Sequence, residues 1–286
     1  MAIAWVLNLD ADLELGAGDR YAPTRSVRAA MRPHADRLAR ALLDPDDVRV
    51  DDASAPDSAR GLPGRAFCPT PRALSLLLRA GAIPEPHPAV EVLRRVNGRA
   101  FCAALGPTLP GAAFVVDLEV ARKKLATQPP IGSAWRIKPA FGMSGRGHRV
   151  VTPGDDLDFL GGLVARGGVM IEPNVAVDTE WARHGVLAVD GSAIFGALVR
   201  QRCDAHGQWL ATERVTDPPS DVAAALDREV RSVGEALHAA GYFGPFGVDA
   251  FTFRDGAALR LQPRSEINAR YSMGFAAGFA ARRSRV

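Results

Sequence analysis

The sequence predicts a mixed α/β (α+β) fold in which strands and helices alternate along the chain. Residues 2–9 form a short apolar run that ends at an acid, which is typical of a buried strand. From residue 112 onward, short apolar strands alternate with amphipathic helices. Two further pairs of strands flank the dipeptides Asp190-Gly191 and Asp255-Gly256, which favour β-hairpin turns.

The composition is that of an ordinary globular protein. The chain has 286 residues, of which 47% are hydrophobic and 23% charged, enough for one large domain or a few small lobes. No apolar run reaches the roughly 18 residues needed to cross a bilayer, and the N-terminus lacks the basic segment of a signal peptide. We therefore expect a cytoplasmic protein without membrane contact. The three scattered cysteines predict neither a metal site nor a disulfide framework.

The charge pattern argues against a nucleic-acid partner. The net charge is only +3, although the pI is about 9.0, and arginines alternate with acids along the chain. No basic stripe with interleaved aromatic residues stands out. Lysine occurs at only three positions, 123, 124 and 138. A lysine kept in such an arginine-rich background indicates a need for lysine itself.

The first 95 residues are expected to form a small N-terminal α/β lobe. After the strand at 2–9, an acidic stretch is expected to be a solvated loop, with contact to a substrate amine as the alternative. A helix is expected at about 24–43. Segment 44–64 is rich in Asp, Pro, Ser and Gly, which is typical of a loop or a weak strand. The acids of the expected loop are Asp10, Asp12 and Glu14.

A clearer helix begins at Thr70-Pro71, because Thr is a favoured N-cap and Pro a favoured first helical residue. It is expected to run to about Arg79 and to end before Gly81. The proline-rich segment 83–88 is a stiff connector, and it predicts the end of the N-terminal lobe.

The remaining elements follow from the same patterns. They are helices at 89–95 and 99–105, a strand at 113–116, a helix at 117–126, strands at 134–140 and 148–152, a helix at 155–166, strands at 168–172, 183–189 and 193–201, a helix at 219–240, strands at 247–254 and 257–262, and a helix from 272.

A lysine and a run of glycines stand between two of these strands. Glycines let a backbone approach a phosphate closely, and a lysine adds a mobile positive charge. A P-loop or dinucleotide-binding loop would need a helix after the glycines, whereas a strand follows here. The loop is therefore predicted to be a hairpin flap over phosphates, with an ordinary glycine-rich hairpin as the alternative. The residues are Lys138, Gly142, Ser144, Gly145 and Gly147.

A second group of polar residues follows near the C-terminus. Glu266 and Asn268 are two residues apart, so on an extended strand both side chains face the same way. A carboxylate and an amide oxygen suit Mg²⁺, and Asp249 on the neighbouring strand is a candidate third ligand. The alternative is an ordinary surface Glu with a turn Asn.

Taken together, these motifs resemble the ATP-grasp superfamily over roughly residues 95–275. Lys138 with its glycine hairpin, Gly247-Val-Asp249 and Glu266-Ile-Asn-Ala-Arg270 occur in that order. The string Phe67-Cys-Pro-Thr-Pro-Arg-Ala-Leu is similar to one in uncharacterised bacterial members. The resemblance implies an ATP-grasp fold, with two α+β lobes that clamp ATP after a smaller N-terminal lobe. The expected boundaries are 1–95, 96–170 and 171–286.

The resemblance also implies roles for further residues. Arg99 stands where such proteins place a second phosphate-binding cation, often a lysine. Glu172 and the backbone that follows, as far as Val175, would meet the adenine, and Glu180 would hold the ribose hydroxyls. Arg270 would face the terminal phosphate or an acyl phosphate, because its planar fork suits phosphate oxygens.

One position conflicts with simple hairpin pairing. If the turn lies at Asp255-Gly256, Asp249 pairs with about Gln262, which is four residues or roughly 13 Å from Glu266. We expect a bulge or wide loop at 262–265 to draw the second strand back. Without it, Asp249 would not be a metal ligand.

The resemblance implies an ATP- and Mg²⁺-dependent ligase that activates a small carboxylate as an acyl phosphate for attack by an amine. Alternatives are a small-molecule kinase of the same fold and a nucleotide-binding protein without turnover. A nicotinamide-dependent oxidoreductase fits less well, because it would need a helix after Gly147. A homodimer is expected only because dimers are common in this fold class.

Overall fold

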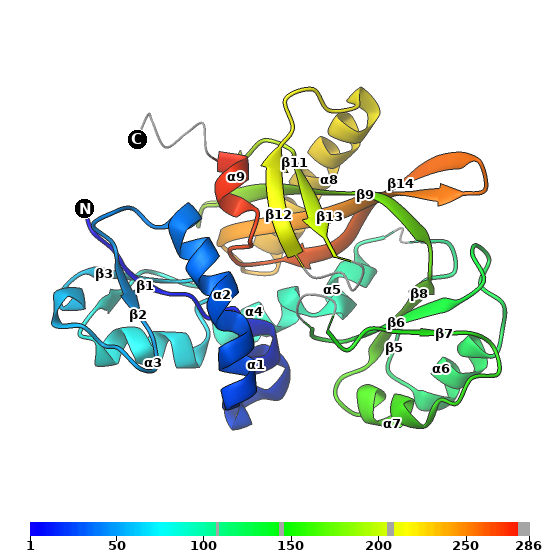
Figure 1. Cartoon of the computed structure of the whole chain (residues 1–286), viewed down its shortest axis with the longest axis horizontal. Coiled ribbons are helices and arrows are strands. Elements are labelled where there is room, and N and C mark those ends of the chain that lie inside the picture. The colour runs from blue at the N-terminus through cyan, green and yellow to red at the C-terminus, as the bar shows by residue number, and fades with distance from the viewer. Residues whose placement is uncertain (107–108, 143–145, 205–208, 280–286) are drawn as a thin grey trace.

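The chain builds three sheets, which follow one another along the sequence (Figure 1). The computed structural model describes residues 1–106, 109–142, 146–204 and 209–279. Sheet A belongs to the N-terminal part, sheet B to the middle and sheet C to the C-terminal part. Helix α5 lies between sheets B and C in Figure 1, so the chain passes between these sheets as it leaves the N-terminal part.

Sheet A is parallel, with β1 between its neighbours. Ala4, Trp5 and Val6 of β1 are all buried, as expected of a parallel strand covered on both faces. In spatial order the strands are β2 (Val48–Val50), β1 (Ala4–Val6), β3 (Pro63–Ala66) and β4 (Ile83–Pro84), and the helices are α1 (Ala11–Ala17), α2 (Arg25–Leu42) and α3 (Pro71–Arg79), with 3₁₀ turns η1 (Gly18–Arg20) and η2 (Asp57–Ala59).

The predicted acidic loop is wrong, because these residues are buried and helix α1 begins there. Asp10, Asp12 and Glu14 are 6%, 5% and 6% exposed. A buried carboxylate needs charged or hydrogen-bonding partners, and each finds them in a distant segment. Glu14, for example, accepts hydrogen bonds from the Thr70 hydroxyl at 2.7 Å and from the Arg72 backbone N–H at 2.9 Å. Local sequence patterns do not reveal such partners.

Helix α3 begins at Pro71, as predicted, but Thr70 does not cap it through its side chain. The Thr70 hydroxyl instead donates to Glu14 and accepts from the Asn8 amide at 3.0 Å. These bonds tie the start of α3 to the end of β1. Elsewhere side chains do cap: Thr24 accepts from Val27 N at the start of α2.

Sheet B is antiparallel and contains the predicted flap hairpin, β6–β7. Helices α4 (Val90–Asn97) and α5 (Arg99–Ala104) lead into it. Its strands are, in spatial order, β5 (Ala113–Val115), β8 (Val169–Pro173), β6 (Trp135–Pro139) and β7 (Arg149–Val151), and its helices are α6 (Leu118–Leu125) and α7 (Asp158–Val164). Trp135, Ile137 and Ile171 form part of a core that belongs to this segment alone.

Sheet C is also antiparallel, and helix α8 packs against it (Figure 1). Its strands are, in spatial order, β12 (Trp209–Arg214), β11 (Val199–Cys203), β9 (Ala176–Leu187), β13 (Gly244–Asp255) and β14 (Ala258–Asn268), while β10 (Ala193–Phe195) pairs with one end of β9, and the helices are α8 (Ser220–Ala239) and α9 (Phe275–Phe279). Among the described residues no helix combines the length and apolar character needed to cross a membrane.

Three details of sheet C differ from the prediction. β9 begins at Ala176 and not at 183, and β12 was not predicted at all. The single strand expected at 193–201 is two strands, interrupted at Gly196. A Cβ on Gly196 would lie 3.0 Å from the Gly278 carbonyl oxygen and from the Phe279 ring. The chain bends there because α9, from the far end of the sequence, packs against it.

The expected bulge in the β13–β14 hairpin is confirmed. Phe251 pairs with Gln262, but Asp249 pairs with Glu266, so Ala250 lies opposite three residues, 263–265. The extra residues include a proline, which has no N–H for a regular ladder. The bulge brings Asp249 and Glu266 to adjacent positions on neighbouring strands.

The largest core joins the N-terminal and C-terminal parts. It contains Trp5 of β1 and Leu38 of α2 together with Val233 of α8 and Phe246 of β13. Sheet A also has a smaller core of its own against α3. Sheets A and C are therefore held together by shared packing, whereas sheet B is packed around a separate core.

Candidate nucleotide and metal site

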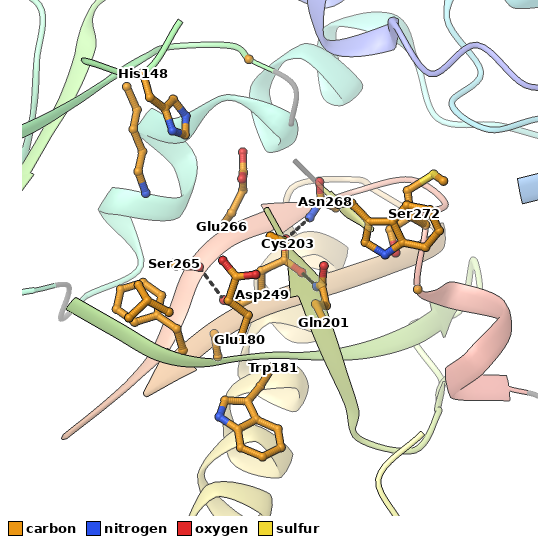
Figure 2. Close-up of a pocket in the computed structure, with 18 of the residues that line it drawn as sticks. His148, Glu180, Trp181, Gln201, Cys203, Asp249, Ser265, Glu266, Asn268 and Ser272 are labelled. Atoms are coloured by element: carbon orange, nitrogen blue, oxygen red, sulfur yellow. Dashed lines mark hydrogen bonds between the residues drawn. The ribbon is translucent and has the colours of Figure 1, made fainter. Parts of the chain in front are cut away.

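A cavity of about 680 Å³ opens between sheets B and C and reaches the N-terminal part. This volume lies within the range of small-molecule sites in proteins. Its walls include residues of β6 and β8 on one side, β9, β11, β13 and β14 on another, and the ends of β1 and β3 on the third. Figure 2 shows polar side chains from these elements converging on it.

The structure brings most of the predicted site residues together at this cavity. Arg99 and Gly147 are not in its lining within the described part of the chain, and Ser144 and Gly145 lie outside the described residues. The predicted residues that line it are Lys138, Gly142, Glu172, Val175, Glu180, Asp249, Glu266, Asn268 and Arg270.

Sheet B supplies the basic wall of the cavity. The Lys138 Nζ lies 2.5 Å from Glu172 Oε1, and both side chains are largely buried. Arg136 Nη2 donates to Asn174 Oδ1 at 2.7 Å, next to this pair. Burial, with the charges of Arg99, Lys138 and Arg136, lowers the pKa of His148 to about 3. The imidazole is therefore uncharged at neutral pH.

Glu172 was predicted to face the adenine, yet its carboxylate is bound to Lys138. The backbone after it leads to Val175, which lines the cavity together with Val150 and Val177. These apolar side chains lie where sheets B and C meet. They could cover a flat aromatic base. Glu180, on β9, lies opposite Gln201 and Phe251 in the sheet and also lines this region.

Arg99 connects the two sheets from behind the cavity wall. Its Nη1 donates to the Pro139 carbonyl at 2.6 Å, and its Nη2 donates to Glu266 Oε1 at 2.8 Å. The side chain is 6% exposed. A Cβ on Gly142 would lie 3.1 Å from Arg99 Nη1, so a larger residue there would crowd the guanidinium. Gly147 adopts a positive φ of 79° at the turn into β7, where a glycine is favoured.

Sheet C supplies the acidic wall. Asp249 accepts hydrogen bonds from Gln201 Nε2 and from Asn268 Nδ2, both at 2.8 Å (Figure 2). Burial, and then the charge of Glu266, raise the pKa of Asp249 to about 7. Because Asn268 donates through its nitrogen, its amide oxygen is left for another partner. Two carboxylates and an amide oxygen form the hard-oxygen set that Mg²⁺ prefers.

The repulsion within this acidic wall is the observation that fits a cation. Arg99 reaches Glu266 but Asp249 has only neutral amide partners in the described part of the chain. Among the described residues no three His, Cys, Asp or Glu side chains gather as a metal cluster. A cation here would thus rely on Asp249, Glu266 and the Asn268 amide, with its other positions filled by water or substrate.

Sequence reasoning missed polar residues of the site, among them Arg136 on β6, Gln201 and Ser272. Gln201 on β11 supports Asp249, and Ser272 lines the cavity beyond Asn268. In the sequence, Gln201 stands between two arginines, and successive residues of a strand face opposite sides of the sheet. In the structure Arg200 and Arg202 are exposed, whereas Gln201 is partly buried. Ser272 had no signal in the sequence, since its partner, His184, lies 88 residues away.

Arg270 lines the cavity, but its guanidinium is held by Asp12. Its Nη2 donates to Asp12 Oδ2 at 2.6 Å and its Nε to Asp12 Oδ1 at 3.2 Å. Its Nη1 donates to the Tyr271 carbonyl at 3.1 Å, and its plane lies over the Phe67 ring. The acid that was expected in a solvated loop therefore sets the position of the predicted phosphate ligand.

Replacing Asp12 by Asn should lower the free energy of unfolding by about 1.5–3 kcal/mol, because Arg270 would lose its charged acceptor inside the protein. Urea unfolding at pH 7 measures this change. The matched control is Asp46→Asn, which alters an exposed acid in the same part of the chain. Equal stabilities of the Asp12→Asn variant and the wild type would contradict the expectation.

Comparison with solved structures supports the fold. No family profile matches the sequence, and no curated protein matches it. Biotin carboxylase from Campylobacter jejuni, solved as a β-γ-ATP complex, superposes with a TM-score of 0.59 and 13% identity over 97% of this chain and 67% of that one. N5-carboxyaminoimidazole synthetase from Staphylococcus aureus, complexed with ADP, gives 0.55 and 13% over 95% and 71%.

A third match is D-alanyl-alanine synthetase A from Vibrio cholerae, with a TM-score of 0.56 and 10% identity over 93% of this chain and 88% of that one. All three are ATP-grasp enzymes. The similarity extends over nearly the whole chain, including the N-terminal part that precedes sheets B and C. The chain therefore has an ATP-grasp fold.

Proposed function

We propose that the chain is an ATP-dependent ligase, which activates a carboxylate as an acyl phosphate for attack by an amine. The observation that carries the proposal is the arrangement of opposite charges across one cavity. Lys138 and Arg136 line the side formed by sheet B, and Asp249 and Glu266 line the side formed by sheet C. A phosphate chain bound through a divalent cation needs both walls at once.

The nucleotide would lie along sheet B. Its base would fit against the apolar side chains around Val150 and Val175, and its ribose hydroxyls would reach Glu180. Lys138, released from Glu172, would contact the phosphates, and so would Arg99. The glycine flap would contact them too, although its Ser144 and Gly145 lie outside the described residues. Positive charges already in place stabilise charge that develops on a transferred phosphoryl group.

Asp249, Glu266 and Asn268 would hold Mg²⁺, which would neutralise charge on the phosphate oxygens. Arg99 and Glu266 contact each other at 2.8 Å. In the nucleotide complex we expect phosphate oxygens to replace Glu266 on Arg99, and Glu266 to turn to the cation. The ion pair would then keep Arg99 and Glu266 near their final positions before the nucleotide binds.

The reaction needs no protein nucleophile. One oxygen of the substrate carboxylate attacks the terminal phosphorus of ATP, the bond from that phosphorus to the bridging oxygen breaks, and ADP leaves. An amine nitrogen then attacks the acyl carbon, inorganic phosphate leaves, and the nitrogen loses a proton to give an amide. Arg270 lines the cavity and would face the acyl phosphate, held there by Asp12.

The structural neighbours support the nucleotide assignment. One was solved with ADP, and the carboxylase domain from Hydrogenobacter thermophilus was solved with MgADP and bicarbonate, at 13% identity and a TM-score of 0.56. The latter is a domain dimer, which is compatible with the homodimer proposed for this chain. We also propose the three lobes 1–95, 96–170 and 171–286, a cytoplasmic location and no nucleic-acid partner.

Mg-ATP is expected to stabilise the folded protein by about 2.7 kcal/mol at a concentration 100 times its dissociation constant. Thermal unfolding with and without ATP and Mg²⁺ measures this shift. ATP with EDTA is the control for the metal, and Glu266→Gln is the variant that should reduce the metal-dependent part. A well-folded protein whose midpoint does not move at millimolar Mg-ATP would contradict the proposal.

The products distinguish the alternatives. Hydroxylamine converts an acyl phosphate into a hydroxamate, so a ligase should release ADP and form a hydroxamate with the right acid. A kinase acting on an alcohol would release ADP and form a stable phosphate ester without hydroxamate. A binding protein without turnover would show the thermal shift and release no ADP.

A further inference from the structure

The cavity continues past the acidic wall to the N-terminal part of the chain. In Figure 2, Ser272 lies on the far side of Asn268 from His148, so this end is remote from the basic wall. Its lining includes four apolar side chains, Leu9, Met31, Phe67 and Met273, beside His34 and Arg270. Leu9 and Phe67 belong to the shared core, and the two methionines pack against that core. We refer to these four residues as the apolar end.

His184 stands directly behind Ser272 and is fully buried. Three glycines surround its ring: added Cβ atoms would lie 2.9 Å from its Cδ2 at Gly247, 3.1 Å from its Cε1 at Gly274 and 3.3 Å from its Nδ1 at Gly278. None of the three has a positive φ, so the backbone conformation does not require glycine at these positions. The space that the imidazole ring needs does explain why glycine is there. Phe275 closes the cage with an edge contact.

Ser272 Oγ lies 2.7 Å from His184 Nε2, while Nδ1 has no hydrogen-bond partner among the described residues. Burial lowers the pKa of His184 to about 4, so the ring is neutral and carries one N–H. If that hydrogen were on Nδ1, a buried donor would stay unsatisfied, which is rarer and costlier than an unused acceptor. The hydrogen therefore belongs on Nε2 and is donated to Ser272.

This assignment determines what Ser272 offers to a ligand. Its oxygen already accepts from the histidine, so its own hydrogen is free to point into the cavity that it lines. Arg270, the nearby cation, directs donors to Asp12 and to the Tyr271 carbonyl. Ser272 is thus a neutral donor placed at the junction of the acidic wall and the apolar end.

We infer that the apolar end binds a carboxylic acid with an apolar side chain, and that a carboxylate oxygen accepts the Ser272 hydrogen bond, with His184 as the positioning residue. The inference rests on the proposed function and names the substrate class of that site. The side chain would contact Leu9, Met31, Phe67 and Met273. The carboxylate would lie between Ser272 and the bound phosphates.

The ring tautomer can be tested without any substrate. In protein labelled with ¹⁵N-histidine, two-dimensional NMR that correlates ring protons with ring nitrogens distinguishes the two neutral forms. We expect His184 to carry its hydrogen on Nε2, and Ser272→Ala, which leaves the cage intact, identifies its signals by their shift. A hydrogen on Nδ1 would overturn the role given to Ser272.

The substrate class can be tested with two series of acids: straight-chain acids from acetate to hexanoate, and 2-amino acids from glycine to norleucine. ADP release with Mg-ATP and hydroxylamine gives kcat/KM for each. Each added methylene should raise kcat/KM about fourfold until the apolar end is filled. A flat or falling trend, or a preference for acids with a second charge, would overturn the assignment.

Ser272→Ala should raise the KM of the best acid by about 10- to 100-fold, the loss of a hydrogen bond to a charged oxygen. The Mg-ATP dissociation constant should not change. Ser232→Ala, an exposed serine on α8, is the matched control. An unchanged KM in an active Ser272→Ala enzyme would overturn this inference alone, whereas a wild type inactive with every acid would overturn the proposed function as well.

Discussion

Replacing Lys138 by Met should reduce ADP release by about 10²- to 10³-fold, the loss typical when one positioned charge or donor is removed from a transition state. Lys138 is placed for this role by β6, which projects it into the cavity beside Arg136. The nearby His148 is uncharged at neutral pH, so it cannot replace the lost charge.

The same substitution should also lower the free energy of unfolding by about 3–5 kcal/mol, because it leaves the Glu172 carboxylate buried without its cation. The double variant Lys138→Met with Glu172→Gln removes both charges and should recover most of that stability. It should not recover turnover. The double variant therefore separates the phosphate role of the lysine from its structural role.

ADP release and urea unfolding, measured on the single and double variants, check both expectations. Lys123→Met is the matched control, since it removes an exposed lysine from the same sheet-B lobe. A double variant that is stable and also as active as the wild type would show that Lys138 serves only as a partner of Glu172.

Asp249→Asn should make the metal-free protein more stable above pH 7. It should also abolish the stabilisation of the folded protein by Mg²⁺. Burial, and then the charge of Glu266, raise the pKa of Asp249 from 3.8 to about 7. Between about pH 4 and pH 7 the folded protein therefore keeps a proton that the unfolded chain has lost. Stability falls as the pH rises through this window, and stays reduced above it.

A shift of about three units corresponds to a loss of up to about 4 kcal/mol at pH 8, which an uncharged Asn would avoid. The gain is reduced by about 1 kcal/mol if the new amide nitrogen meets a donor from Gln201 or Asn268. Gln201 can limit this loss by turning its amide oxygen toward the new side chain. At pH 4 the wild-type side chain is itself protonated, so the gain should disappear.

Urea unfolding in EDTA from pH 4 to pH 8, followed by a Mg²⁺ titration at pH 8, measures both effects. The control is Asp217→Asn, which removes an exposed carboxylate from sheet C's side of the molecule. A wild type whose stability does not fall between pH 5 and pH 7, or a variant that still gains stability from Mg²⁺, would show that Asp249 is not a strained metal ligand.

The sequence predicted well the features that depend on residues close in the chain. Helix starts such as Thr70-Pro71 and hairpin turns are local signals: α3 begins at Pro71 as predicted, and the β13–β14 turn lies at Gly256-Ala257, one residue later than predicted. The bulge was predicted by a conflict: Asp249 and Glu266 could meet only if the second strand carried extra residues, as it does. The hypothesis that Asp249 and Glu266 share a metal site thus predicted the bulge, which hairpin pairing alone would not have done.

The features that the sequence did not predict depend on contacts between distant segments. Asp12 is buried because Arg270 reaches it from 258 residues away, so a local reading could only place it in solvent. The predicted strand at 193–201 breaks at Gly196 because α9 packs there. His184 and Ser272 are ordinary polar residues until the fold places them 2.7 Å apart.

The shared core determines which parts of the molecule open together. Sheets A and C are packed together through residues such as Trp5 and Phe246, whereas the segment around Trp135 and Ile171 has a core of its own. Amides of sheet B should therefore exchange with solvent as a separate group, while those of sheets A and C exchange together. A nucleotide bound to both sheets B and C would couple the opening of these two groups of amides. Its binding would therefore slow the exchange of amides far from the atoms that it contacts.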